Sequence, residues 1–247
     1  FKELIETNTT HSTGDTLVAA ERMATHLLDA GFPEADVQVI NNAPRKGNLV
    51  ARYRSPAPTK KPVLFLAHID VVEANPEDWN LPPFEFIEQD GFYYGRGTVD
   101  DKDEAAIAVA NFITLKEQGF VPTRDIIIAL TADEEGGEEN GVVYLLEKHP
   151  DLVDAAFVIN EGGGGGLRQG KPVGNSVQAA EKVYQSYNLV ITNRGGHSSL
   201  PRSDNAIYAL AKALSAIEAH RFPISFNEVT RAYFKASSQT MKTADRK

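Results

Sequence analysis

Cysteine is absent from this chain of 247 residues. Disulfide bonds and thiolate metal sites are therefore excluded, and histidine, aspartate and glutamate are the strong metal ligands that remain. The absence leaves the redox compartment open, because a protein without cysteine is compatible with either an oxidising or a reducing one.

Long apolar runs and excess positive charge are also missing. No apolar run approaches the roughly 20 residues that cross a bilayer, so we expect no membrane as partner. The 25 Lys and Arg residues against 34 Asp and Glu give a net charge of −9, which is the wrong sign for releasing counterions from nucleic acid. We therefore expect no nucleic acid as partner either, and the 42% of hydrophobic residues is typical of a soluble globular protein.

The chain begins at Phe1, without an initiator methionine or a signal-like apolar segment. We expect it to be a processed form or an excised piece of a longer protein. Its location stays open between the cytoplasm and, after removal of a leader, the periplasm or the outside of the cell.

Hydrophobic periodicity predicts alternating helices and strands over most of the chain. Apolar residues recur with helical spacing over residues 16–30, 104–118 and 141–149. Short runs rich in β-branched residues lie between them, at residues 48–53, 63–67, 125–131 and 155–160. These runs lack clean alternation, which is typical of strands buried on both faces, so we predict an α/β fold with a mostly parallel sheet flanked by helices.

The pattern changes after residue 182. Apolar residues alternate with polar ones at Tyr187, Leu189 and Ile191, as in a half-solvated strand. A helix is predicted behind them over residues 207–217, with Ser203 or Asp204 as its N-cap. We therefore predict two domains, residues 1–182 and a partial, smaller α+β domain over residues 183–247.

Acidic residues and one histidine follow the predicted strands directly. His68 and Asp70 follow the second strand run, Glu134 and Glu135 the third, and Glu161 the fourth. Asp100 and Asp101 lie between a short strand over residues 92–94 and a helix. Because ligand sites of open α/β sheets lie at the carboxyl ends of the strands, we expect these side chains to meet at one edge.

Each group by itself has a purely structural alternative. The His68–Asp70 pair is equally compatible with a buried, satisfied imidazole. Asp100 fits helix capping through the macrodipole, and Glu134 and Glu135 fit a solvated turn. Together, however, several carboxylates at one edge would repel one another unless a multivalent cation neutralised them. We therefore predict a metal site.

The donor types narrow the metal and the chemistry. Oxygen donors with imidazole and without thiol suit zinc, and also manganese or cobalt. A carboxylate that bridges two ions roughly 3.5–4 Å apart, with a water between them, gives an arrangement that hydrolases use. Another carboxylate must stay off the metal to accept the proton of that water, and the adjacent Glu134 and Glu135 can divide these tasks.

Five motifs stand in a characteristic order and spacing: HID at residues 68–70, GRGTVDDKD at 95–103, TADEEGG at 131–137, NEGG at 160–163 and GGHSS at 195–199. They resemble the di-zinc amidohydrolase and metallopeptidase family of aminoacylase, bacterial glutamate carboxypeptidase, carnosinase and succinyl-diaminopimelate desuccinylase. The resemblance covers nearly the whole chain. It implies a zinc-peptidase-like catalytic domain over residues 1–182 and part of a lid or dimerisation domain over residues 183–247, through which a homodimer would form.

The resemblance implies a role for each site residue. The metal ligands would be His68, Asp100, Glu135 and Glu161, with Asp100 bridging two zinc ions. Glu134 would be the general base, and Asp70 would orient the site without binding metal. His197 would stabilise the oxyanion, in dimeric members at the partner subunit's site. The family often has a cis peptide after the bridging aspartate, here between Asp100 and Asp101.

The implied reaction is the metal-dependent hydrolysis of amide bonds in N-acyl amino acids or short peptides. Arg202 is a candidate for binding the substrate carboxylate. Many members have aspartate where this chain has Glu161, and the remaining histidine ligand of the family lies beyond His220, after which this chain has no histidine. We therefore expect this truncated chain to be metal-poor and inactive unless it is complemented.

Three alternatives stay open: a non-catalytic metal- or peptide-binding module on the same fold, a nucleotide-binding protein, and an interaction domain with an acidic surface. The nucleotide alternative depends on a near-match to a phosphate loop that ends in Gly170 and Lys171. Pro172 disfavours it, because it supplies no hydroxyl and biases Lys171 away from a helix. We interpret Gly162 and Gly163 instead as a sharp turn after Glu161, and residues 164–166 as its mobile extension.

Overall fold

The computed structural model describes residues 1–179 and 181–240, and the chain divides into a first unit, Phe1–Gly162, and a second unit, Gly163–Lys247. The predicted domain boundary between residues 182 and 183 concerns the domains of a longer family fold and stays a prediction.

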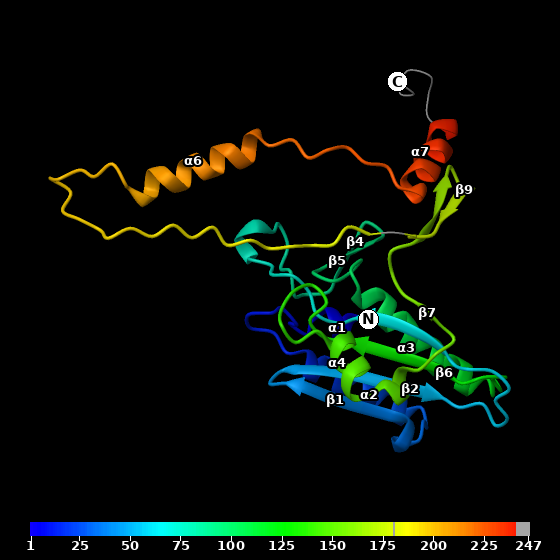
Figure 1. Ribbon diagram of the computed structural model, residues 1–247. Coiled ribbons are helices and arrows are strands. Elements are labelled where there is room, and N and C mark those ends of the chain that lie inside the picture. The colour runs from blue at the N-terminus through cyan, green and yellow to red at the C-terminus, as the bar shows by residue number, and fades with distance from the viewer. Residues whose placement is uncertain (180, 241–247) are drawn as a thin grey trace. The chain divides into compact units, whose positions relative to one another are not determined.

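One five-stranded sheet organises the first unit, in the order β1-β2-β6-β3-β7 (Figure 1). Its strands are β1 (Val37–Ala43), β2 (Lys46–Tyr53), β3 (Val63–His68), β6 (Ile126–Thr131) and β7 (Phe157–Ile159). All four runs that were predicted as major strands lie in this sheet. The three central strands carry apolar residues on both faces, as expected for strands that are covered on both sides.

The sheet is mixed, so the prediction of a mostly parallel sheet was wrong. β3 pairs in parallel with β6 and β7, whereas β1–β2 and β2–β6 are antiparallel pairs. β1 leads into β2 through the two residues Pro44 and Arg45, and Arg45 adopts a left-handed φ of 64°. A connection this short joins only antiparallel strands, because a parallel crossover needs a dozen or more residues.

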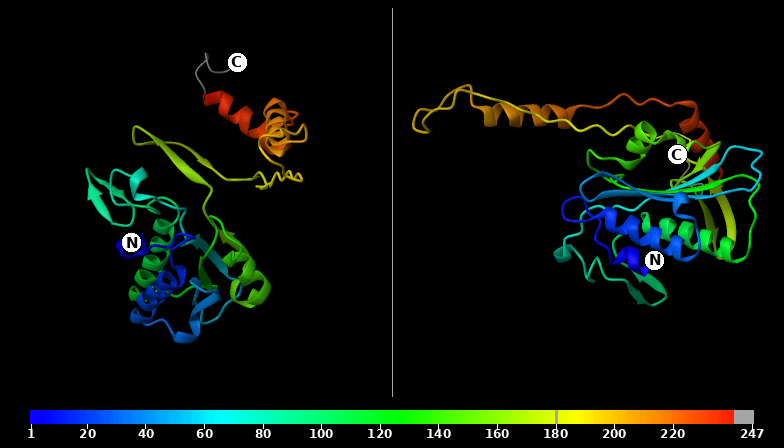
Figure 2. Two further views of the ribbon diagram at one scale, coloured as in Figure 1. Left: turned by 90° about the vertical axis from the view of Figure 1, so that its left-hand side faces the viewer. Right: turned by 90° about the horizontal axis from the view of Figure 1, so that it is seen from below.

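Helices cover both faces of the sheet (Figure 2). α2 (Thr16–Asp29) and α3 (Lys102–Glu117) pack on one face, and α4 (Gly141–Lys148) and α5 (Pro150–Val153) on the other. The larger core, on the α2 and α3 side, includes Met23, Leu27, Leu49, Val109, Phe112, Ile128 and Leu130. The smaller core, on the α4 side, consists of Val50, Leu64, Ile127, Ala129 and Leu145. The alternation of residues 127–130 between the two cores follows from the period of two along β6.

Side-chain caps define where the helices begin. The Asp15 carboxylate accepts the Val18 amide at 3.1 Å at the start of α2, and the Asn140 side chain accepts the Val143 amide at 3.1 Å at the start of α4. Gly31, with a φ of 84°, follows the end of α2 as predicted. The smaller elements of this unit are α1 (Lys2–Ile5), η1 (Glu34–Asp36), η2 (Pro76–Asp78), β4 (Ile87–Gln89) and β5 (Phe92–Tyr94).

The second unit contains a hairpin of β8 (Gly164–Arg168) and β9 (Lys171–Ser176), followed by α6 (Ala206–Ala219) and α7 (Glu228–Thr240). The interpretation of residues 164–166 as a mobile extension was wrong, since they form part of β8. Gln169 and Gly170 both have positive φ, 52° and 74°, which suits a tight two-residue hairpin turn. Lys171 begins a strand and not a helix, as Pro172 indicated.

Two local predictions for this unit were also wrong. Residues 187–191 form neither helix nor strand, because an alternating pattern produces a strand only where a neighbouring strand offers hydrogen bonds. The N-cap of α6 is Asn205, whose side chain accepts the Ile207 amide at 2.9 Å. Asp204 is instead engaged by Arg202 through two hydrogen bonds of 2.6 Å.

Within residues 1–179 and 181–240, none of the helices has both the length and the apolar character that crossing a bilayer requires.

Candidate metal centre

The register of the parallel strands brings the predicted site residues to one edge. β3 ends at His68 directly opposite Thr131, the last residue of β6. The Ile69 amide extends the pairing by donating to the Thr131 carbonyl at 2.9 Å. The segments after these two strands therefore start side by side, and β7, on the other side of β3, leads to Glu161.

His68 lies at the centre of the cluster with only 3% of its side chain exposed. Its Nε2 atom is 2.8 Å from Asp100 Oδ1, 3.9 Å from Glu134 Oε2 and 3.9 Å from Glu161 Oε1. A single imidazole nitrogen thus faces three carboxylates that come from three separate segments of the chain.

Asp70 connects His68 to the turn that carries the two adjacent glutamates. Its Oδ1 accepts the Glu134 amide at 3.1 Å and its Oδ2 accepts the Glu135 amide at 3.0 Å. Its backbone carbonyl lies 3.1 Å from His68 Nδ1. Asp70 therefore holds the imidazole through its backbone carbonyl and the backbone of both glutamates through its buried carboxylate.

The loop before α3 supplies Asp100 and Asp101 with different surroundings. The peptide bond between them is cis, which confirms the prediction. Asp101 is buried, and its Oδ2 accepts the His68 amide at 3.1 Å. The side chain of Asp100 is 61% exposed, which leaves carboxylate oxygen free for a ligand.

Among the described residues, two groups have the spacing that a metal ion requires. One is His68, Asp100 and Glu135; the other is His68, Glu134 and Glu161. In each group the ligand atoms all lie within 4.8 Å of one another. The structure thus brings together His68, Asp70, Asp100, Glu134, Glu135 and Glu161, the six site residues predicted in the first unit.

Electrostatics indicate that this cluster carries unbalanced negative charge. Burial alone would lower the pKa of His68, but its interactions with Asp70, Asp100 and Glu134 outweigh burial and raise that pKa to about 10. Burial, together with neighbouring carboxylates such as Asp100 and Glu134, raises the pKa of Glu135 and of Glu161 above the ordinary glutamate value. A divalent cation would balance this charge in place of protons, so the donor set of one imidazole and several carboxylates fits zinc.

The pKa values of two buried aspartates of the cluster are shifted in opposite directions. Burial favours the neutral form of Asp70, yet hydrogen bonds with His68 and with the amides of Glu134 and Glu135 hold its pKa below the ordinary value. Asp101 makes fewer such bonds, and burial raises its pKa to about 7. The charged form of Asp70 is therefore favoured beside His68, whereas the charged form of Asp101 is disfavoured.

The remaining predicted residues belong to the second unit. Nδ1 of His197 lies 2.8 Å from Ser199 Oγ and accepts the Ser199 amide at 3.2 Å. The guanidinium of Arg202 is engaged by Asp204, so its candidacy for binding a substrate carboxylate is weakened. The ring of His220 packs edge-on against Phe222, with 4.7 Å between ring centroids.

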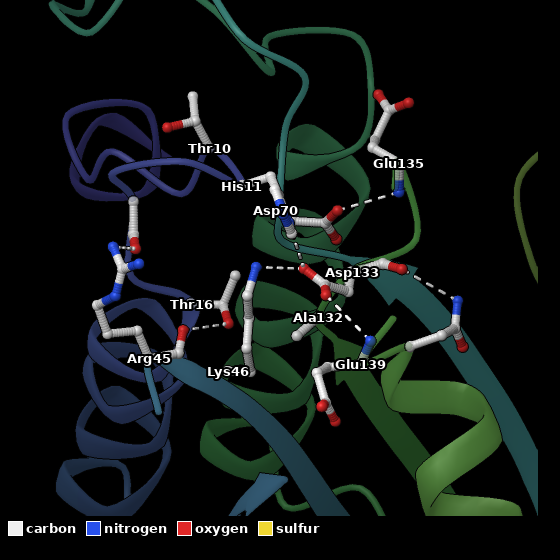
Figure 3. A network of polar contacts seen from close by, with 12 residues as sticks. Thr10, His11, Thr16, Arg45, Lys46, Asp70, Ala132, Asp133, Glu135 and Glu139 are labelled. Carbon is white, nitrogen blue, oxygen red and sulfur yellow. Dashed lines mark hydrogen bonds and ion pairs between the residues drawn. The ribbon is translucent and has the colours of Figure 1, made fainter. Parts of the chain in front are cut away.

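Sequence analysis missed a buried ion pair beside the cluster, between Lys46 and Asp133 (Figure 3). Lys46 begins a strand and Asp133 precedes Glu134, so both positions suggested exposure to solvent. The only signal was the cluster of five acidic residues at 133–135 and 138–139 without a basic residue nearby in sequence, a cluster that a cation from elsewhere in the chain would neutralise.

Comparison with known proteins agrees with this geometry. Residues 64–241 match the model of peptidase family M20/M25/M40. The chain is similar to an N-fatty-acyl-amino acid synthase/hydrolase of Xenopus tropicalis, with 39% identity over 67% of this chain and 33% of that protein. It is also 34% identical to a "probable succinyl-diaminopimelate desuccinylase" of Staphylococcus aureus, over 74% of this chain and 42% of that protein.

The fold is similar to that of human carnosine dipeptidase 1, with a TM-score of 0.53 and 22% identity, over 65% of this chain and 36% of that chain. The chain thus spans between a third and about two fifths of the length of these curated relatives.

Proposed function

This chain belongs to peptidase family M20/M25/M40, and from that premise we propose that it provides the metal-binding part of a hydrolase. The substrates are N-acyl amino acids or short peptides, and the bond that is cleaved is an amide. The observation that carries this proposal is the convergence of His68 Nε2 with the carboxylates of Asp100, Glu134 and Glu161 at the carboxyl edge of the sheet.

The ligand roles follow the family pattern. His68 and Glu161 would hold one zinc ion, Glu135 would hold the other, and Asp100 would be the ligand that the two ions share. Cobalt or manganese is an alternative to zinc in such a donor set. In the described part of the chain, His68 is the one imidazole in either donor group, so we expect one ion to be held more firmly than the second.

The proton transfers fall to the protein. Zinc bound here would polarise the scissile carbonyl and make a water more acidic. Glu134 accepts the proton of the attacking water and returns it to the leaving nitrogen. Asp70 supports this role because it holds the backbone amide of Glu134 and so limits where the carboxylate can go. His197 donates to the oxyanion as charge develops there, and the second unit contributes to a lid or to a homodimer.

The test is the variant Glu134→Gln, which keeps the size of the side chain but cannot accept the proton. We expect turnover to fall by about 10²–10⁴-fold while zinc content is retained. Turnover is measured as amine release from a panel of N-acyl amino acids and dipeptides, in a protein extended to the length of the curated relatives. We expect the 247-residue chain alone to show no turnover.

The control is Glu138→Gln, which removes a charge from the same turn but lies outside both donor groups. Loss of zinc from Glu134→Gln would assign Glu134 as a ligand and contradict its role as base. A parent protein that binds zinc but releases amine from no substrate would favour the alternative, a non-catalytic binding module on the same fold.

A further inference from the structure

The turn that carries Glu134 and Glu135 is built around the buried carboxylate of Asp133. Asp133 is 2% exposed and has a left-handed φ of 57°, a conformation that is uncommon for non-glycine residues, although aspartate adopts it more often than most. Its Oδ2 accepts the Glu139 amide at 3.3 Å, and its backbone carbonyl accepts Asn140 Nδ2 at 3.2 Å. The segment from 133 to 140 therefore closes on Asp133.

The neighbouring glycine shows how tightly this segment closes. A β-carbon at Gly137 would collide with the carboxylate of Asp133, and the φ of Gly137 is 130°. Both the space and the backbone conformation at this position thus require glycine. The turn has little freedom to rearrange while the carboxylate stays in place.

Lys46 holds that carboxylate from the opposite side. It is the first residue of β2, and its Nζ contacts Asp133 Oδ1 (Figure 3). Only 9% of the Lys46 side chain and 1% of the Asp133 side chain are exposed. The N-terminal loop adds His11, whose Nδ1 lies 3.8 Å from the same oxygen. Asp133 thus joins the turn to two segments that are remote from it in sequence.

We propose that Lys46 is a positioning residue that acts through Asp133 to hold the backbone of Glu134 and Glu135 where these side chains reach the metal. Asp70 binds the two amides from one side, and the Lys46–Asp133 pair fixes the residue directly before them from the other. The part of this inference that concerns metal binding rests on the proposed function. The part that concerns the order of the turn does not.

Physical reasoning favours positioning over simple stabilisation. A buried ion pair is a weak means of stabilising a fold, because desolvation of both charges cancels much of their attraction. Its geometry, however, is specific, and groups that orient metal ligands typically change metal affinity by about 10–100-fold when they are removed. Asp133 directly precedes Glu134 and is two residues from Glu135, so the Lys46–Asp133 pair has the position that such a role requires.

The test compares Lys46→Met with a matched control on the same strand. Arg52 lies near the other end of β2 and pairs with Asp125, at 3.1 Å between Nη1 and Oδ2, with side chains 16% and 13% exposed. Arg52→Met therefore breaks a similarly buried pair far along the strand from the site. Both variants are made in the 247-residue chain, with Lys46→Arg as the conservative variant.

Amide hydrogen exchange and zinc titration give two separate readouts. We expect Lys46→Met to speed exchange of residues 132–140 at least about tenfold relative to the core of β6, and to weaken zinc binding by about 10–100-fold. Arg52→Met should leave the exchange rate of residues 132–140 and the zinc affinity within about threefold of the parent values. Lys46→Arg should restore most of the zinc affinity, because it keeps the positive charge.

A double-variant cycle tests whether Lys46 acts through Asp133. Lys46→Met with Asp133→Asn should lose no more zinc affinity than either single variant, since one interaction is removed in all three. If Lys46→Met does not fold, Asp133→Asn, which keeps the shape of the side chain, replaces it in the comparison with Arg52→Met.

The inference would be overturned if Lys46→Met kept the amide exchange and zinc affinity of the parent. It would also be overturned if Arg52→Met changed the exchange and the zinc affinity as much as Lys46→Met does. Faster exchange with unchanged zinc affinity would overturn it as well. A parent chain that binds no zinc would agree with the expectation that this chain is metal-poor, and the exchange rates alone would then decide whether Lys46 orders the turn.

Discussion

Glu161 is a predicted metal ligand that follows a short strand at the edge of the sheet. It follows β7, a strand of three residues that pairs only with β3 at the edge of the sheet. Gly162 turns the chain immediately afterwards with a φ of 97°. Oε1 of Glu161 nevertheless lies 3.9 Å from His68 Nε2, so a metal bound by His68 would be within reach of the Glu161 carboxylate.

We predict that Glu161→Ala weakens zinc binding at least about tenfold, a loss of about 1.4 kcal/mol in binding free energy. The reason is that one of the few anionic donors around His68 is removed, while no buried contact is lost. Isothermal titration with zinc measures the affinity, and thermal unfolding in chelator reports the stability of the metal-free protein.

The matched control is Glu138→Ala, which removes the same charge from an exposed position outside both donor groups. Its zinc affinity should stay within about twofold of the parent, because an exposed charge at a distance is largely screened. Equal affinity losses in both variants would mean that general charge, and not ligation by Glu161, attracts the metal.

Single residues were predictable from sequence where chain order alone determined their position. His68, Glu134 and Glu161 each follow a strand run directly, and parallel strands end at a common edge. Lys46 and Asp133 were not predictable, because their meeting depends on the antiparallel pairing of β2 with β6. These two strands are far apart in sequence, so their pairing leaves no local pattern.

At the scale of elements, Lys102 ties the N-terminal segment to α3. Lys102 is completely buried, and its Nζ donates to the carbonyls of Leu4 at 2.9 Å and Thr7 at 2.8 Å. Burial lowers the pKa of this amine to about 7, against the opposing charge of Asp70. A buried lysine with two carbonyl partners therefore fastens α1 and the residues just after it to the first turn of α3, beside Asp100 and Asp101.

We predict that Lys102→Met lowers the free energy of unfolding by about 1–3 kcal/mol. Methionine replaces the apolar stem but donates no hydrogen bond, so the Thr7 carbonyl loses this donor and the Leu4 carbonyl keeps only the Thr7 amide, at 3.2 Å. Urea unfolding measures the loss, and amide exchange should be fastest to change in residues 4–9. Lys148→Met, at the exposed end of α4, should change stability by less than about 0.5 kcal/mol; a comparable loss there would argue against the buried contacts as the cause.

Helices and strands were predictable from sequence where the apolar periodicity matches the buried face. They were not predictable where pairing with another strand determines whether a strand forms. The helices at residues 16–29, 102–117 and 141–148 have apolar faces that pack on the sheet, so their pattern is visible in sequence. β8 contains three glycines and shows no strand pattern, yet it pairs with β9 along its whole length. Residues 187–191 show the opposite case, an alternating pattern without a paired neighbour.

At the scale of the whole molecule, the described side chains differ sharply between the two units. Every buried side chain among the described residues belongs to the first unit, and the second unit has none in residues 163–179 and 181–239. Folding free energy depends mainly on apolar surface removed from water. The stability of the chain should therefore reside in the first unit.

We predict that a chain ending at Gly162 keeps the unfolding midpoint of the 247-residue chain within about 3 °C, equivalent to about 1 kcal/mol. It should also keep zinc affinity within about threefold, because both donor groups lie before Gly162. Calorimetric unfolding and zinc titration of the two chains provide the comparison. A midpoint lowered by about 10 °C or more would show that the second unit supports the first. Unchanged stability with lost zinc binding would mean that the second unit supplies a ligand. Either result would contradict the view that the donor groups of the first unit fold and bind metal without the second unit.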